Sequence, residues 1–375
     1  MRQKIVAFIK KETVLTAAAV LALLSMLVIV PDREYGYYLD YRTLGLLFSL
    51  MLVMAGFREL GVFGKLGNFL LSKTDSIKGV SAVLIFLCFF TSMLITNDVA
   101  LLTFVPLAMI VLEMAQCEKI LIPVVVMQTI AANLGSMLLP FGNPQNLYLY
   151  GLSGLTIMEF VKLLFPLGAV SFGLLLLHLQ FLPKGKIRCK SEEKKEILHK
   201  KEKAVLLILT FAFLLCVLAV ARILPWLWVV LLVAVVVFFL KKSLFLKLDY
   251  SLLLTFVFFF IFIGNLGRIS QFSEILRRIM KDNEVITAVL ASQCISNVPA
   301  ALLLSGFTDN YSKLLVGCNI GGLGTLIASM ASLISYKQVS EQKPEKKSRY
   351  FAYFTVANLI YLGILLAVYC LLYRY

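Results

Sequence analysis

Charged residues are scarce in this sequence of 375 residues. They make up 15% of the chain, whereas 60% of the residues are hydrophobic and the mean hydropathy is +0.91. Soluble domains carry about 25% charged residues, so this composition excludes a soluble globular protein and predicts an all-α polytopic membrane protein. The net charge of +15 comes from Lys and Arg in short loops, where membrane orientation explains them. We therefore expect the lipid bilayer as a partner and no nucleic acid.

Cysteine pairs, metal-binding spacings and protease motifs are missing as well. The sequence contains no His-Glu-x-x-His, and Asp98 is the one acidic residue deep within an apolar stretch, whereas an intramembrane aspartyl protease needs two. We expect neither an enzyme nor a bound cofactor. Cys294 and Cys318 lie near a polar break and could bind a soft metalloid, although small packing residues explain them better. No disulfide framework is expected from the seven cysteines, Cys88, Cys117, Cys189, Cys216, Cys294, Cys318 and Cys370.

Basic residues mark the cytoplasmic loops and give an orientation. Met1–Lys11 is basic and precedes an apolar run without a small-residue cleavage site. We therefore expect an uncleaved first span with its N-terminus inside. The segment 183–203 is the most basic in the chain and is also predicted to be cytoplasmic. The remaining crossings then put the C-terminus outside, in a multi-pass protein of the cytoplasmic (inner) membrane.

Two polar breaks interrupt the apolar sequence. Thr96–Ala100 lies between uncharged runs, and Ser296–Ala300 lies near the middle of only 24 uncharged residues, too few for two crossings of about 20 residues each. Two half-helices of about 11 residues reach about 16 Å each, half of a ~30 Å hydrocarbon core. We therefore expect a re-entrant hairpin over 284–308, entering from the outer side. By the internal match we expect another over 79–112, entering from the cytoplasmic side.

Interruptions rich in Gly and Asn follow each hairpin. The uncharged run 120–158 contains Gly135, Pro140, Gly142 and Pro144, and the run 314–336 contains three glycines between positions 321 and 324. Each is predicted to be a broken crossing, which gives about nine full crossings when the hairpins are not counted. Polar backbone at membrane depth is costly unless it lines a cavity or binds something. We therefore expect the four breaks to meet at one site.

The sequence also contains an inverted repeat. Leu39-Asp40-Tyr41 opens one unit and Leu248-Asp249-Tyr250 the other, and each is followed by a span, an amphipathic stretch, a hairpin, a broken crossing and a final span. The first spans run in opposite directions, a pattern typical of secondary transporters that bind substrate and ions between the repeats. Converging helix N-termini, each with about half a positive charge, favour an anion there. The predicted segments are 1–38 (N-terminal span and outer loop), 39–182 (repeat 1), 183–203 (basic loop), 204–248 (linking spans) and 249–375 (repeat 2).

The residues at the four breaks resemble the ion transporter superfamily. It includes arsenite permeases, D-type sodium–proton antiporters, citrate–metal carriers and sodium-coupled dicarboxylate symporters. The resemblance runs from about Leu39 to the C-terminus and rests on both hairpin motifs and the Asn- and Gly-rich runs after them. It implies an elevator-type carrier, commonly a homodimer, with substrate and cation held at the hairpin tips and helix breaks. Dicarboxylate symporters carry Ser-Asn-Thr at both tips. Asp98 and Val298 replace the Thr here, which is closer to the arsenite permease branch.

The candidate site residues cluster at these breaks. We expect Asp98 to bind a cation or carry a proton, with a helix-capping role as the alternative. Asn97 and Asn297 have the same alternative, and a Na⁺ ion would lie near these three residues. The predicted substrate- and ion-binding set is Thr96, Asn97, Asp98, Asn133, Gly135, Ser136, Gly142, Asn143, Asn146, Ser296, Asn297, Pro299, Asn319, Gly321, Gly322, Gly324 and Thr325.

These features predict a secondary active transporter of a small anion or oxyanion, coupled to Na⁺ or H⁺. Efflux of arsenite or antimonite is the first alternative. An ion channel is another, since broken helices also line pores, although inverted repeats with closed tips favour a carrier. Sodium–proton exchange ranks last, because it usually needs more than one buried carboxylate.

Overall fold

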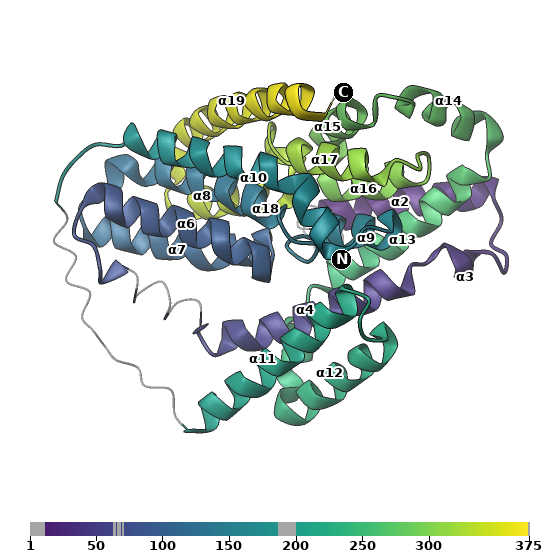
Figure 1. Cartoon of the computed structure of the whole chain (residues 1–375), viewed down its shortest axis with the longest axis horizontal. Helices are drawn as coiled ribbons and strands as arrows, with labels where there is room; N and C mark the ends of the chain where they lie inside the picture. Colours follow the sequence, from purple (N-terminus) through teal and green to yellow (C-terminus); the bar gives the residue numbers. More distant parts are fainter. Residues whose placement is uncertain (1–11, 63–64, 66–68, 70, 187–199, 374–375) are drawn as a thin grey trace, which may run out of the picture.

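The computed structural model describes residues 12–62, 65, 69, 71–186 and 200–373, and this part of the chain folds into helices without strands (Figure 1). The predicted all-α class is therefore confirmed. The helices of repeat 1 and the segment before it are α2 (Thr13–Val28), α3 (Tyr35–Tyr38), α4 (Tyr41–Glu59), α6 (Ile77–Ile95), α7 (Asn97–Met114), η1 (Glu118–Ile120), α8 (Leu121–Ser136), α9 (Pro144–Ser153) and α10 (Ile157–Gln180). The remainder are α11 (Lys200–Val220), α12 (Trp226–Lys241), η2 (Lys242–Lys247), α13 (Tyr250–Gly267), α14 (Ser270–Met280), α15 (Glu284–Ile295), α16 (Asn297–Ser305), α17 (Tyr311–Gly321), η3 (Leu326–Ala328), α18 (Met330–Gln342), η4 (Pro344–Lys346) and α19 (Lys347–Tyr373).

Nine helical segments of the described residues are long and apolar enough to cross a membrane. They are α4, α6, α7, α8 with η1, α10, α11, α12 with η2, α13, and α19 with η4. This set differs from the predicted nine, because it includes both arms of the first hairpin and omits both α2 and the broken crossing predicted over 314–336. The 16 residues of α2 reach only about 24 Å at 1.5 Å per residue.

The two hairpins have arms of unequal length. In the second hairpin, α15 has 12 residues and α16 has 9, which correspond to about 18 and 14 Å and fit the expected half-span. In the first hairpin, α6 has 19 residues and α7 has 18, about 28 Å each. Arms of that length match a whole hydrocarbon core, so the re-entrant geometry of the first hairpin stays a prediction.

The helices form two groups. Both hairpins and both broken helices pack together, and we call α6–α9 with α15–α18 the hairpin unit. Helices α4, α11 and α12 pack on one another at the bottom of Figure 1, and we call them the frame. Helix α13 packs against α2 at one side, and α10 and α19 cover the hairpin unit.

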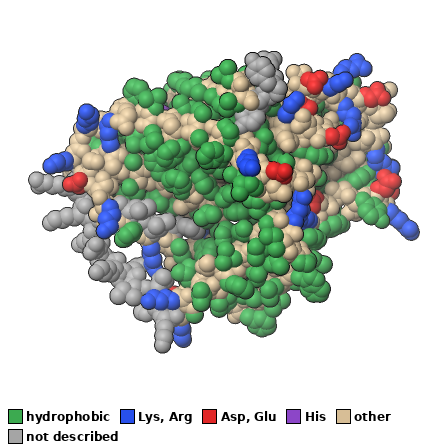
Figure 2. Space-filling model, viewed as in Figure 1, with side chains coloured by type: hydrophobic (Ala, Val, Ile, Leu, Met, Phe, Trp, Pro, Cys, Tyr) green, Lys and Arg blue, Asp and Glu red, His purple; other side chains and the backbone are tan. Residues whose placement is uncertain are grey.

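The surface agrees with a membrane setting. Figure 2 shows hydrophobic side chains across the middle of the visible face and most charged side chains toward its edges. Of the loop segments predicted from charge, 1–11 and 187–199 lie outside the described residues, as does much of the amphipathic stretch predicted over 60–72. Helix α11 begins at Lys200, so the end of the predicted loop 183–203 is helical.

Candidate functional site

Each hairpin turns at a single residue. Thr96 has φ 71° and ψ 151°, and Ser296 has φ 74° and ψ 154°, so the two repeats use the same backbone conformation. The prediction of five-residue breaks was wrong in extent, because the next residue already begins a helix in both cases. Pro299 fits in the first turn of α16, where a missing N–H costs nothing. A positive φ at a side chain such as Thr costs about 1–3 kcal/mol and is found where the surroundings enforce it.

The first tip is hydrogen-bonded to the interior of the protein. The Asn97 side-chain amide donates to Asn133 Oδ1 at 3.0 Å, and the Ser329 hydroxyl donates to the same oxygen at 2.9 Å. Asn133 belongs to the first broken helix, whereas Ser329 precedes α18 in the second. The first tip and both repeats therefore meet at this amide oxygen.

A second set of contacts crosses between the repeats. The Asn143 amide donates to Asn319 Oδ1 at 3.4 Å, and the Asn319 amide donates to Asn146 Oδ1 at 2.7 Å. Asn143 also donates to the Ser136 hydroxyl at 3.2 Å, and that hydroxyl donates to the carbonyl oxygen of Asn133. The first tip and both helix breaks are thus joined in one hydrogen-bonded amide network, whose Asn side chains are all at most 5% exposed.

The second tip lies beside this network with fewer partners. Asn297 is 4% exposed, and its amide nitrogen sits 2.9 Å from where a Cβ on Gly322 would lie, so a side chain at position 322 would have to displace that amide. Among the described residues, the buried Ser296 hydroxyl and the Asn297 side chain have no hydrogen-bond partner. Buried polar groups without partners are unusual and mark places where a ligand or water is bound.

Gln293 organises the second break, although no motif marks it. Its amide donates to the carbonyl oxygens of Gly321 and Leu323, both at 3.0 Å, and its own oxygen accepts from the Thr325 amide at 2.8 Å. Gly324 in this loop has φ 108°, which a side chain would resist. One glutamine of α15 therefore holds the loop that contains three predicted site residues.

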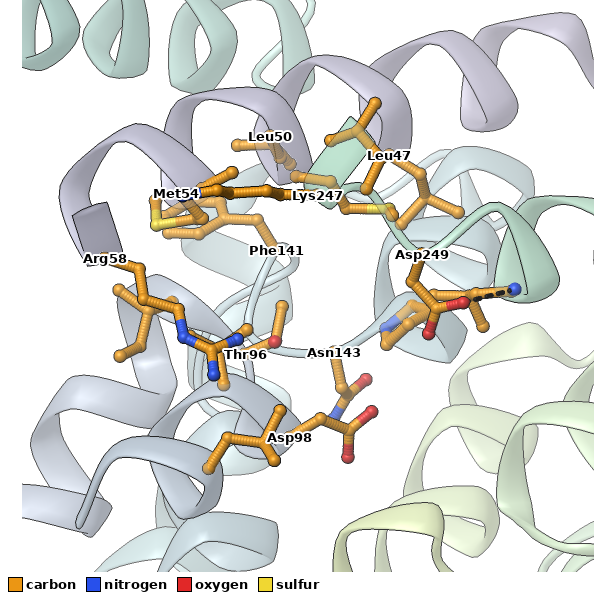
Figure 3. A pocket seen from close by; sticks show the side chains of 18 of the residues that line it. Leu47, Leu50, Met54, Arg58, Thr96, Asp98, Phe141, Asn143, Lys247 and Asp249 are labelled. Atoms are coloured by element: carbon orange, nitrogen blue, oxygen red, sulfur yellow. Dashed lines mark hydrogen bonds between the residues drawn. The ribbon is translucent and has the colours of Figure 1, made fainter. Parts of the chain in front are cut away.

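A cavity of about 580 Å³ reaches the first tip (Figure 3). Its walls come from α4, from the first tip, from the start of α9, and from the end of η2 and the start of α13. Thr96, Asp98 and Asn143 are the predicted site residues that line it. The lining also includes Met330 and Ile334 of α18 but not the second tip, so the cavity reaches the site beside the first tip alone.

Five charged side chains line the cavity, and Asp98 is the one among them that was predicted as a site residue. In Figure 3, Arg58, Asp98 and Asp249 point into the space from three different elements. Lys247 and Lys241 pair with Glu59 at the rim. Asp249 caps α13, where one of its oxygens accepts from the Leu252 amide at 2.9 Å. The available signals were the repeat motif containing Asp249 and the Arg58-Glu59 pair that ends a predicted span.

The capping alternatives receive partial support. Asn97 Oδ1 accepts from the Asp98 backbone amide at 3.0 Å, so Asn97 does bond within the first turn of α7. In the described part of the chain the Asp98 carboxylate has no hydrogen bond or ion pair that would make it a cap. No group of three His, Cys, Asp or Glu side chains among the described residues could hold a metal ion. Cys294 is exposed and Cys318 is buried.

Similarity to known proteins extends over most of this chain. The profile of a family described as "Citrate transporter" matches residues 5–312. The chain is similar to an uncharacterized transporter of Methanocaldococcus jannaschii, with 34% identity over 316 residues, 84% of this chain and 86% of that protein. It is 29% identical over 324 residues to the inner membrane protein YbiR of Escherichia coli, covering 85% and 86%. The silicon efflux transporter LSI3 of Oryza sativa is 30% identical over 168 residues, 44% of this chain and 34% of that protein.

Proposed function

Because the chain belongs to the citrate transporter family, within the ion transporter superfamily, we propose that it is a cation-coupled secondary carrier that moves a small anion across the cytoplasmic membrane. The coupling ion is H⁺ or Na⁺, and the hairpin unit moves against the frame in an elevator-type cycle. The N-terminus lies inside and the C-terminus outside.

The amide network is the observation that carries this proposal. Five Asn side chains at most 5% exposed are embedded among apolar helices, where polar groups are retained when they bind a solute. Four helices begin beside them, namely α7, α9, α16 and α18. Each helix N-terminus carries about half a positive charge and unpaired N–H groups, so their convergence supports an anionic substrate.

Asp98 supports the cation coupling. Its carboxylate faces the cavity from the first turn of α7 and has no hydrogen-bond or ion-pair partner in the described part of the chain. A carboxylate that binds and releases a cation within the substrate cavity can make binding of the two solutes interdependent. The network then provides the substrate contacts, and Asp98 provides the link to the ion gradient.

The position of the cavity supports alternating access. It lies between α4 of the frame and the first tip of the hairpin unit, and reaches the protein surface beside exposed Arg58 and Lys247. Movement of the hairpin unit along α4 would carry the tip from this end of the frame toward the other. The homodimer implied by the family resemblance would keep the frame fixed in the membrane.

Efflux of an uncharged metalloid hydroxide, such as arsenite or antimonite, is the second candidate. The cavity lining contains three carboxylates, Glu59, Asp98 and Asp249, against two cations, Arg58 and Lys247. A multiply charged anion would be repelled by that excess, whereas an uncharged hydroxide would not. A silicon efflux transporter among the similar proteins adds to the case.

Reconstitution into liposomes separates these candidates. A panel of oxyanions, carboxylates and metalloid hydroxides is offered with and without H⁺ and Na⁺ gradients. The proposal expects gradient-driven accumulation of at least one anion and counterflow that saturates. Accumulation of hydroxides alone would favour the second candidate, and flux without saturation or counterflow would indicate a channel and overturn the carrier.

A further inference from the structure

The two ends of α4 have different surroundings, one open and one packed. Its last turn, with Arg58 and Glu59, borders the open cavity. Beside its first turn, a Cβ on Gly151 would lie 3.6 Å from the Thr43 hydroxyl, so the C-terminal end of α9 packs there. The 15 residues from Thr43 to Arg58 span about 23 Å, most of a hydrocarbon core. The protein is therefore open at one side of the membrane and closed at the other.

Arg222 makes the polar contact that ties the frame to α9 at the closed side. It follows α11, and its guanidinium donates to the carbonyl oxygens of Tyr150 at 3.0 Å and Gly151 at 3.1 Å. The same group lies 5.3 Å from the centre of the Tyr150 ring. These carbonyls belong to the last turn of α9, where backbone oxygens lack helical partners and a cation is favourable. The contact therefore joins the frame to the hairpin unit.

The backbone at Arg222 is strained. The residue has φ 63°, and the next amide, of Ile223, donates to the Leu218 carbonyl at 3.0 Å, in the position after a helix where glycine is usual. A side chain in this conformation is disfavoured, and persists where its contacts outweigh the strain. The strain is thus a second, independent sign that the Arg222 side chain has a role.

Other contacts close the same side without a charge. The hydroxyls of Tyr148 and Ser305 share a hydrogen bond of 2.9 Å, which joins α9 to α16 within the hairpin unit. The Tyr148 ring packs on Phe256 and Phe260 of α13, with centroids 6.5 and 5.4 Å apart. These rings form apolar packing between α9 and α13.

We propose that Arg222 is a latch residue that holds the closed side shut by binding the C-terminal end of α9, and that it must release Tyr150 and Gly151 before the carrier opens there. It is a positioning residue, since it touches no cavity-lining group. The inference rests on the proposed movement of the hairpin unit against the frame. On this inference, Arg222 sets the equilibrium between the two access states.

Arg42 offers a matched control. Its guanidinium donates to the carbonyl oxygen of Val220, the last residue of α11, at 3.3 Å. This is the same kind of contact, a guanidinium on a helix-end carbonyl, but both α4 and α11 belong to the frame. Losing it should lower stability without changing which side is open.

The test measures access to the cavity from each side. Met51, which lines the cavity, is changed to Cys as a reporter, and an impermeant maleimide is applied to membrane vesicles of both orientations. Modification of the peptide containing residue 51 is quantified by mass spectrometry, so the native cysteines do not interfere. Arg222→Gly is the main variant because it removes the latch and also relieves the strain at φ 63°. Arg222→Lys keeps the charge with fewer fixed donors.

Arg222→Gly should slow labelling from the open side about threefold or more, since two hydrogen bonds from a charged group are lost. Its melting temperature should fall only slightly, because relief of the backbone strain offsets part of the lost contact. The labelling rate of Arg222→Lys should lie between those of the parent and Arg222→Gly. Arg42→Ala should be labelled at the parent rate but should have a lower melting temperature. Parent-like labelling of Arg222→Gly, or equal slowing by Arg42→Ala, would overturn the latch. Transport by the same proteins is assayed separately, so a parent that carries no solute would count against the proposed function while the labelling still judges the latch.

Discussion

The two hairpin tips share a backbone but differ in chemistry. Thr96 and Ser296 agree within a few degrees in φ and ψ, and each is followed by Asn at the first helical position. The next residue is Asp98 in one tip, facing the cavity, and Val298 in the other, 6% exposed. The first tip has its Asn bonded to Asn133, whereas the Asn297 side chain has no hydrogen-bond partner in the described part of the chain. The two tips therefore share the turn, whereas charge is confined to one of them.

The difference suggests a division of roles between the repeats. The first tip combines a satisfied amide with an unpaired carboxylate at the cavity, which suits a cation. The second tip combines a helix N-terminus, an unpaired hydroxyl and an unpaired amide, and lies outside the cavity lining. On this interpretation, the first tip responds to the coupling ion and the second engages the substrate when the site closes.

The glycines at the two breaks provide the largest expected effect on stability. A Cβ on Gly135 would collide with the backbone oxygen of Phe89, which cannot move away, whereas a Cβ on Gly321 would meet the Ser292 hydroxyl at 2.7 Å. Gly135→Ala should lower the free energy of unfolding by about 3 kcal/mol and Gly321→Ala by about 1–2 kcal/mol. Unfolding of the purified variants in detergent compares them. Equal losses would mean that the two breaks are packed alike.

The tip asparagines come next. Asn97→Ala removes a buried hydrogen bond and should cost about 1–2 kcal/mol, whereas Asn297→Ala removes none and should cost less than about 1 kcal/mol. The order reverses for function, because the unpaired Asn297 amide is the one free to bind substrate. Asn297→Ala should therefore raise the transport KM more than Asn97→Ala does. A larger stability loss from Asn297→Ala would show that its amide has a protein partner.

The smallest effect is expected at a second carboxylate of the same cavity. Glu59 is paired with Lys241 and Lys247, at a rim where both lysines are more than half exposed. Exposed pairs contribute little, so Glu59→Gln should change stability by less than about 1 kcal/mol and leave gradient-driven accumulation intact. Loss of accumulation in this variant would mean that coupling depends on the total charge of the cavity and not specifically on the Asp98 carboxylate.

Local signals in the sequence were enough for the helices and for the positions of the breaks. Apolar runs and polar interruptions predicted helix boundaries within a few residues, as for the hairpin expected over 284–308, which is α15 and α16 over residues 284–305. The bounds of the first hairpin, predicted as 79–112, are close to those of α6 and α7, whereas its re-entrant depth was inferred from the shorter second copy and stays a prediction. The single-residue turns at Thr96 and Ser296 were also hidden, since polarity marks a break but not its length.

The cavity was beyond what local patterns reveal. Arg58 and Asp249 are far apart in the sequence and face Asp98 only because α4 and α13 pack near the first tip. Ser329 and Gln293 looked like ordinary polar residues, yet they hold Asn133 and the second break in place. Residues that support a site only through tertiary contacts do not form a sequence motif, so they can be identified only from the fold.

Asp98→Asn in proteoliposomes tests the division of roles most directly, with accumulation against a gradient and counterflow at equilibrium measured on the same preparation. The variant is isosteric and leaves the Asn97–Asn133 bond in place, so it should fold as the parent does. We expect counterflow to persist while accumulation falls to the level of protein-free liposomes. Undiminished accumulation would remove Asp98 from the coupling step and, with it, the functional meaning of the difference between the two tips.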